Sequence, residues 1–419
     1  MNMSFTSQLR VRFLPVCLCI ATLASSARGA TNNALTLEEA LRLAEKNSPI
    51  LDAALAGWNA AEQRAIAAGS RPNPSFSIGT EGLSPGDRPF TNGDFLAGVS
   101  QTVRLKKPAK LKRDIAEVRR EKAALEYAAA RNRVRQSVSS AFAGALFTQA
   151  NERLFAERIK ILESNAALMK ALADVGELVV ADTESAHADL DHERLDYQEV
   201  IGNRTVAFKQ LATAIGQPDA GFHTLNGKLE PTLALKDLQE LTADLEKLPS
   251  LLAAESEGDI LKLQSQLARA SRIPSLNVEL LYRRNQQNRR DGIDASVAIA
   301  LPLFDDKKAE AKAFAEDANA AKARAQTSRQ NAALEFSRIR NQLLASLNRV
   351  EHIRDELLPH QKEIVRRSEL LLKAGEINQL QANTALLGET TERRHYLNAL
   401  REAHLLWTRI QRFLVTRDE

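Results

Sequence analysis

The sequence has little cysteine, few aromatic residues and no long apolar run beyond its first 30 residues. Only two of 419 residues are cysteine, Cys17 and Cys19, and both lie in that first stretch, so the rest of the chain has no thiol and no disulfide. Aromatic residues make up 5%, which favours long, closely packed helices over a large aromatic core. Without 18 consecutive apolar residues there is no candidate membrane helix, so a membrane-inserted part must consist of strands.

Charge of one sign is also lacking. The formal net charge is +4, and it nearly vanishes if the N-terminal stretch is removed, so net charge does not support nucleic-acid binding. One basic run is interleaved with Asp114 and Glu117; it comprises Lys106, Lys107, Lys110, Lys112 and Arg113. We interpret it as an anchor that faces lipid headgroups or a junction between structural parts, in preference to a nucleic-acid site.

Residues 1–30 have the pattern of an export signal. Arg10 and Arg12 precede an apolar run from Phe13 to Ala24, and small residues offer cleavage after Ala27 or Ala30. A lipid anchor on Cys17 is the less favoured alternative, because Pro and Val suit a lipid-attachment box poorly.

A very long helical hairpin is predicted between Val103 and Pro218. Apolar residues keep helical spacing up to Val175, which gives a rod of roughly 100 Å. Gly176-Glu177 ends the rod, and a return helix of roughly 37 residues follows. A compact domain does not need such a rod, so its length points to function.

Two stretches alternate between apolar and polar residues and predict β-hairpins at about 75–103 and 275–302. A half-buried sheet in a soluble protein is the ordinary interpretation of one such hairpin. Four strands with no other β material instead fit a transmembrane barrel, lipid outside and water inside. Four strands cannot close a barrel, whereas three chains would give about twelve.

The second half repeats the first at an offset near 200 residues: Pro49 and Pro249, Val99 and Val297, and Gly176 and Gly375 correspond. We therefore predict an internal duplication. The segments are a leader (1–30), a first repeat (31–217) with a long helical hairpin at 104–217, a linker (218–242), and a second repeat (243–419) with a helical hairpin at 303–415.

Several motifs together resemble the TolC family of outer-membrane efflux proteins, and the N-terminal third is most similar to its CzcC-like, heavy-metal branch. They are Leu35–Ala44 (LTLEEALRLA), Asn47-Ser48-Pro49, Arg71–Pro74 (RPNP), Leu301–Asp305 (LPLFD) and the paired Gly-Glu turns. The resemblance implies a mostly helical chain with a small β part, assembling as a homotrimer. Duplicated helical hairpins would form a periplasmic α-barrel under a 12-stranded outer-membrane β-barrel.

The same resemblance implies the function and partners. The chain would be a passive exit duct without enzymatic activity or cofactor, serving a proton-driven inner-membrane pump of the RND type through a periplasmic adaptor (membrane fusion protein). The expected cargo is heavy-metal cations or small toxic compounds. A duct for type I protein secretion is the alternative, and a purely structural exported coiled coil is a third hypothesis that leaves the strands unexplained.

Site residues follow from the alternation and the resemblance. Polar inward positions would line the barrel lumen: Thr102, Asn277, Glu279, Asp294 and Ser296. The adaptor would dock on two hairpin tips: Val175, Gly176, Glu177 and Leu178, and Ala374, Gly375, Glu376 and Ile377. Asp182 and Gln381, six positions after each tip glycine, would form the periplasmic constriction, and the missing second acid indicates weak cation selection.

No metal site is predicted. His187 and Asp191 have i, i+4 spacing with His192 beside them, but the surrounding charge favours a solvated helix face. We find no nucleophile-base set, no phosphate-binding glycine loop and no metalloprotease motif.

Overall fold

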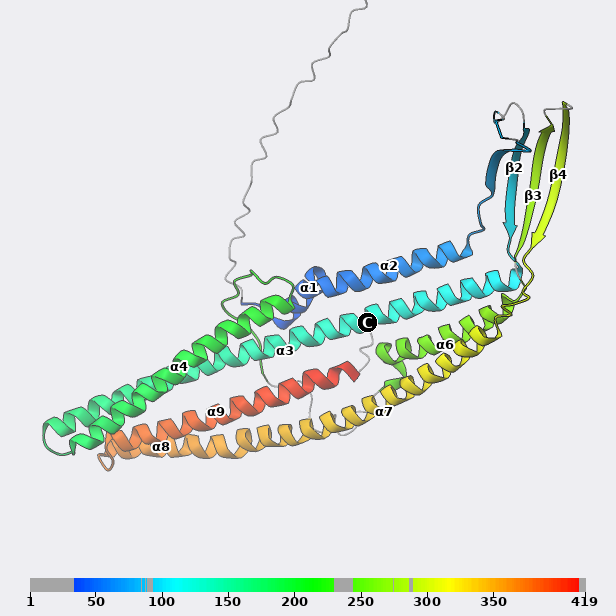
Figure 1. Ribbon diagram of the computed structural model, residues 1–419. Helices are drawn as coiled ribbons and strands as arrows, with labels where there is room; N and C mark the ends of the chain where they lie inside the picture. The colour runs from blue at the N-terminus through cyan, green and yellow to red at the C-terminus, as the bar shows by residue number, and fades with distance from the viewer. Residues whose placement is uncertain are drawn as a thin grey trace, which may run out of the picture. The chain divides into compact units, whose positions relative to one another are not determined.

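A computed structural model describes residues 34–83, 85–86, 88, 93–229, 244–273, 275–285 and 289–413. The expected leader, its cleavage sites and Cys17 lie outside the described residues. Of the two units into which the chain divides, Leu35–Glu419 contains the fold described below (Figure 1).

The described elements are mostly helical. In chain order they are α1 (Leu37–Asn47), α2 (Pro49–Gly69), β1 (Ser75–Glu81), β2 (Asp94–Val103), α3 (Lys106–Asp174), α4 (Val180–Ala214), the short 3₁₀ helix η1 (Leu245–Lys247), α6 (Pro249–Ala270), β3 (Leu276–Asn285), β4 (Arg290–Ile299), α7 (Lys308–His352), the π-helical segment η2 (Ile353–Leu357), α8 (Leu358–Ala374), α9 (Gln379–Ile410) and the short 3₁₀ helix η3 (Gln411–Phe413). The predicted fold class, long helical hairpins with four strands, is confirmed.

Local signals set the first helices. The Thr36 hydroxyl accepts a hydrogen bond from the Glu39 amide at 3.3 Å, so it caps α1. Pro49 occupies the first turn of α2, where its missing N–H costs nothing.

The first hairpin consists of α3, an unbroken helix of 69 residues, and α4, which packs back along it. Apolar residues at helical spacing along α3 are buried, among them Leu111, Ile115, Val138, Phe142, Ala145 and Ala166, whereas Val118, Ile159, Leu162 and Met169 are half-buried. The return ends at Gly216, whose φ is +80°. A Cβ there would approach the carbonyl oxygen of Asn47 to 2.3 Å, so only glycine lets α4 end against α1.

The second hairpin follows the same path with one interruption. Between α7 and α8 the chain forms the π-helical segment Ile353–Leu357. Pro359 follows at once; it has no N–H, and its ring would clash with the carbonyl group of Asp355 in a regular α-helix. A locally wider turn relieves that clash.

One antiparallel sheet contains all four strands in the order β1-β2-β3-β4. Its register pairs Val99 with Phe76 on one side and with Leu280 on the other, and Glu279 with Ser296. Paired residues point to the same face, so the alternation of each strand adds up to two continuous faces. β1 and β4 are edge strands, each with one partner.

The main core lies where the two halves meet, near the middle of the long helices. It includes Val138 and Phe142 of α3, Leu211 of α4 and Leu343 of α7. Part of the expected linker belongs to it: Leu225 is buried, and the Gln149 side chain exchanges two hydrogen bonds with its backbone. Residues 230–242 of that linker lie outside the described part of the chain.

Candidate functional site

The first hairpin tip lies between α3 and α4. Gly176 has a φ of +80°, and the Gly176 and Glu177 amides donate to the carbonyl groups of Ala173 and Leu172, which closes the last turn. Val175, Val179 and Val180 are each about 70% exposed. This tip therefore presents bare apolar side chains beside the acidic Glu177.

The second tip has the same backbone and a different cap. Gly375 has a φ of +75°, and the Glu376 amide donates to the Leu371 carbonyl. The Asn378 side chain accepts from the Gln381 amide while the Gln381 side chain accepts from the Asn378 amide. This capping box is absent from the first tip, where Val179 occupies the N-cap position.

The two predicted constriction residues are both exposed and occupy the same place in the first turn of their helices. Asp182 lies in the first turn of α4, where a carboxylate interacts favourably with the helix dipole. Gln381 is held in the capping box of α9. In the single chain, Gln381 therefore stabilises the start of α9.

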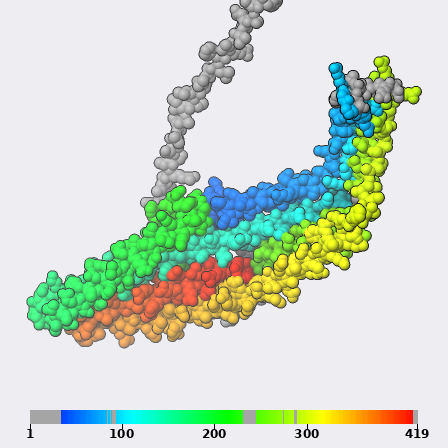
Figure 2. Space-filling view, viewed as in Figure 1, coloured from blue at the N-terminus to red at the C-terminus, as the bar shows by residue number. Residues whose placement is uncertain are grey.

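Between the core and the tips, buried polar side chains connect the two hairpins. Arg158 of α3 forms a two-point ion pair with Glu193 of α4, at 2.7 Å from Nε and 3.1 Å from Nη2, and its Nη1 donates to Thr390 and Thr391 of α9. The two charged side chains are 13% and 9% exposed. Asn383 of α9 also donates to Asn165 of α3 at 2.6 Å. These bonds join the two hairpins between the core and the tips, where Figure 2 shows the surfaces of the hairpins lying against each other.

The five predicted lumen residues share one face of the sheet, here called the polar face. Thr102 pairs with Asn277, and the Ser296 hydroxyl donates to Glu279 at 3.4 Å. Farther along, Arg283 forms ion pairs with Glu81 at 2.8 Å and Asp294 at 3.0 Å. Leu96 and Leu281 also lie on this face, which is therefore less uniformly polar than the alternation suggests.

The opposite, apolar face of the sheet is uncovered. Phe76, Ile293 and Val297 are 71%, 74% and 67% exposed. An apolar surface of this extent needs a partner, and lipid is one that matches it. Among the described helices, none is both long enough and apolar enough to cross a membrane.

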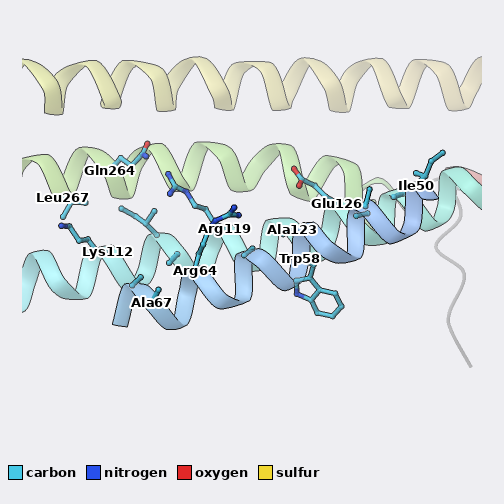
Figure 3. A pocket seen from close by; sticks show the side chains of 18 of the residues that line it. Ile50, Trp58, Arg64, Ala67, Lys112, Arg119, Ala123, Glu126, Gln264 and Leu267 are labelled. Carbon is cyan, nitrogen blue, oxygen red and sulfur yellow. The ribbon is translucent and has the colours of Figure 1, made fainter. Parts of the chain in front are cut away.

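A groove of about 1030 Å³ lies beside α3, between α2 and α6 (Figure 3). Many of its lining residues are small, among them Ala53 and Ala61 of α2 and Ala116 and Ala123 of α3. Five cations line it: Arg64, Arg104, Lys112, Arg119 and Arg133. This cationic cluster was not predicted from the sequence, although Lys112, Arg119 and Arg133 recur at heptad spacing, which places them on one stripe of a helix.

The candidate metal ligands lie on one exposed helix face and form no metal site. His187, Asp191 and His192 are exposed on α4, and Asp191 pairs with Arg194 at 3.4 Å. Within the described ranges, no group of three or more His, Cys, Asp or Glu side chains is arranged to hold a metal ion.

Shifted pKa values mark local ion pairs outside the sheet. Hydrogen bonds from Arg366 and Arg367 lower the pKa of Glu363 on α8 to about 2. Hydrogen bonds from Lys307 and Lys308 hold the pKa values of Asp305 and Asp306 below their usual range. Burial lowers the pKa of His404, although its contact with the Leu229 carbonyl opposes that shift.

Comparison with known proteins agrees with this geometry. Residues 40–217 match the family model described as "Outer membrane efflux protein". The chain is 24% identical to the cobalt-zinc-cadmium resistance protein CzcC of Cupriavidus metallidurans over 380 residues, which cover 91% of this chain and 90% of that protein.

Solved structures share the fold. The open-state MtrE outer membrane channel of Neisseria gonorrhoeae superposes with a TM-score of 0.70 at 16% identity, over 90% of this chain and 88% of that one. The CmeC outer membrane channel of Campylobacter jejuni gives 0.69 at 16% identity, over 90% and 85%. These are folds of channel proteins, not of enzymes. The long helical hairpins, the two-faced sheet and the chain-long similarity agree: the chain has a TolC-like fold, and its residues 40–217 resemble the outer membrane efflux protein family.

Proposed function

We propose that this chain is the outer-membrane duct of a tripartite efflux system, exporting heavy-metal cations or other small toxic solutes. One observation carries the proposal: a four-stranded sheet with an uncovered apolar face and a polar face lies at the end of very long helical hairpins. Similarity to a protein named for cobalt, zinc and cadmium resistance supports metals as the cargo.

The proposed assembly is a homotrimer. A sheet with two open edges and four strands cannot enclose a pore, and each open edge is a template for another strand. Pairing β4 of one copy with β1 of the next would close a barrel of about twelve strands, an even number in the known range. The apolar face would then contact outer-membrane lipid, and the helices would extend into the periplasm.

Such a duct performs no chemistry. It offers a water-filled path through a hydrocarbon layer, lined by Thr102, Asn277, Glu279, Asp294 and Ser296. A periplasmic adaptor would dock on the hairpin tips, where exposed valines beside Glu177 offer an apolar contact with a charged rim. The adaptor would connect the duct to an RND pump in the inner membrane, and the constriction near Asp182 and Gln381 would widen on docking.

The decisive experiment deletes the gene and measures tolerance to cobalt, zinc and cadmium against tolerance to dyes and drugs. We expect metal tolerance to fall and plasmid-borne protein to restore it. The protein should be found in the outer-membrane fraction as an oligomer that resists mild heating. Unchanged tolerance to every compound, together with loss of a secreted protein, would favour type I secretion instead.

A double variant tests the tips. Gly176→Pro with Gly375→Pro removes the positive φ angles that both turns require. We expect oligomers in the membrane and no restoration of tolerance. Full restoration by this variant would exclude the tips from the mechanism.

A further inference from the structure

The groove beside α3 has a strong excess of positive charge. Of its five cationic residues, Arg64, Lys112, Arg119 and Arg133 form no ion pair with any carboxylate that the structure describes, and Arg104 donates only to the Ser70 carbonyl. Glu126 is the one acidic lining residue. It lies 3.8 Å from the Lys122 ammonium, so its charge is already partly compensated.

The groove adjoins a second cavity that reaches the polar face of the sheet. Arg104 and Lys112 line the groove and also a second, smaller cavity of about 290 Å³ at the junction of strands and helices. Thr102 on the polar face of β2 and Ser275, which directly precedes β3, line that cavity. Arg104 follows Thr102 by two residues, directly after the end of β2, and both line this cavity. The cationic stripe therefore continues the polar face.

The other side of α3 is covered by α1. Arg131 and Arg135 form ion pairs with Glu45 of α1 at 3.1 and 3.3 Å. At about 100° per residue, Arg133 projects about 160 to 200° away from both. The groove face is thus the face of α3 that α1 leaves open.

We propose that the groove lines the same water-filled passage as the polar face and forms a section that concentrates anions directly below the barrel. This inference rests on the proposed function, because three copies must close the passage. Five cations from each copy would then surround one lumen, where low-dielectric walls strengthen their field. The ligand class is small phosphates, sulfonates and carboxylates. A metal cargo would cross this section as an anionic complex or together with its counter-ions.

Ion selectivity of the purified oligomer in a planar bilayer tests the proposal. Under a KCl gradient we expect a reversal potential with the sign for chloride preference. Arg119→Glu with Arg133→Glu should abolish or invert that preference. Lys110→Glu is the matched control, since Lys110 projects from the far side of α3, about 180° from Arg119. Potassium preference of the unaltered protein, or equal effects of control and double variant, would overturn the inference while leaving the duct intact.

A second measurement does not require an open channel. The fluorescent trisulfonate pyranine, added to the solubilised oligomer at low ionic strength, should show raised anisotropy that salt reverses. The Arg119→Glu, Arg133→Glu variant should lower its affinity at least tenfold, and Lys110→Glu should leave it within a factor of two. A stable oligomer that neither binds pyranine nor prefers chloride refutes the anion section. A protein that forms no oligomer and conducts no ions contradicts the proposed function as well.

Discussion

The two halves of this chain follow the same path with different local solutions. In the first half α3 runs unbroken for 69 residues, and its tip has no side-chain cap. In the second half Pro359 is accompanied by a π-helical segment, and the tip has a complete capping box. Both tips nevertheless turn at a glycine with a φ near +80°. The two halves therefore share the backbone geometry of the tip turn but differ in helix continuity and in capping.

The halves differ in sequence but are joined by a buried charge. Arg158 in the first half connects Glu193 with the hydroxyl groups of Thr390 and Thr391 in the second. A buried ion pair adds little to the free energy of unfolding, but removal of one partner is costly because the other charge is left buried and unpaired. The two hairpins should therefore respond as one body to a force on either tip.

The largest expected effect comes from breaking this connection. Arg158→Met should lower the free energy of unfolding by about 3 kcal/mol, because Glu193 is left as a buried, unpaired carboxylate. Adding Glu193→Met should restore most of the loss. Guanidinium unfolding of the solubilised protein measures both. The control is Arg194→Met, which removes an ion pair with Glu163 between half-exposed side chains and should lower the free energy of unfolding far less than Arg158→Met does. An equal loss would mean that burial of the ion pair is irrelevant here.

The sheet is where both halves should respond alike. Val99→Asp in the first half and Val297→Asp in the second each place a carboxylate on the apolar face, at a cost of about 2 kcal/mol per chain near the bilayer midplane. Ala298→Asp, on the polar face beside Asn277, is the matched control. Yield of heat-resistant oligomer in the outer-membrane fraction is the measurement. Normal insertion of Val297→Asp with failure of Ala298→Asp would reverse the inside-outside assignment.

The tip glycines give a smaller, paired effect. Gly176→Ala and Gly375→Ala should each destabilise the adjacent turn by about 1 kcal/mol, because a Cβ disfavours a positive φ although both sites have free space. Gly202→Ala, within α4 and also unobstructed, should stabilise by roughly 0.5 kcal/mol. Hydrogen exchange of the tip amides distinguishes these outcomes. A neutral Gly375→Ala beside a costly Gly176→Ala would show that the two turns are not equivalent.

The smallest effect concerns the caps. Asn378→Ala removes the capping box and should destabilise the start of α9 by about 1 kcal/mol. Val179→Asn supplies the missing cap to α4 and should stabilise it by about 0.5 kcal/mol. Protection of the first-turn amides against exchange should fall in the first variant and rise in the second. No change on capping α4 would mean that its first turn is already fully ordered by packing.

Most of the fold was predictable because its signals are local. Thr36, Pro49 and the glycine turns start and stop helices through their own backbone chemistry, and alternation along each strand identifies the two faces before any pairing is known. The register that aligns Val99 with Leu280 had to be seen in the structure, because these residues lie about 180 positions apart along the chain.

The candidate site was predictable only in part. The tip residues and lumen positions follow from turn chemistry and alternation. The capping role of Gln381, the Arg158 ion pair and the cationic groove did not, because each depends on which helix faces lie opposite each other. Heptad spacing places Lys112, Arg119 and Arg133 on one stripe of α3, but it does not predict that α2 and α6 line a groove together with this stripe.

The sequence by itself determined two long helical hairpins, four amphipathic strands and the turns between them, since each depends on neighbours within a few residues. Only the tertiary structure decided that the strands form one sheet with an uncovered apolar face, that a buried arginine joins the hairpins, and that unpaired cations line one groove beside α3. Those features depend on contacts between distant segments, where packing and electrostatics act through space.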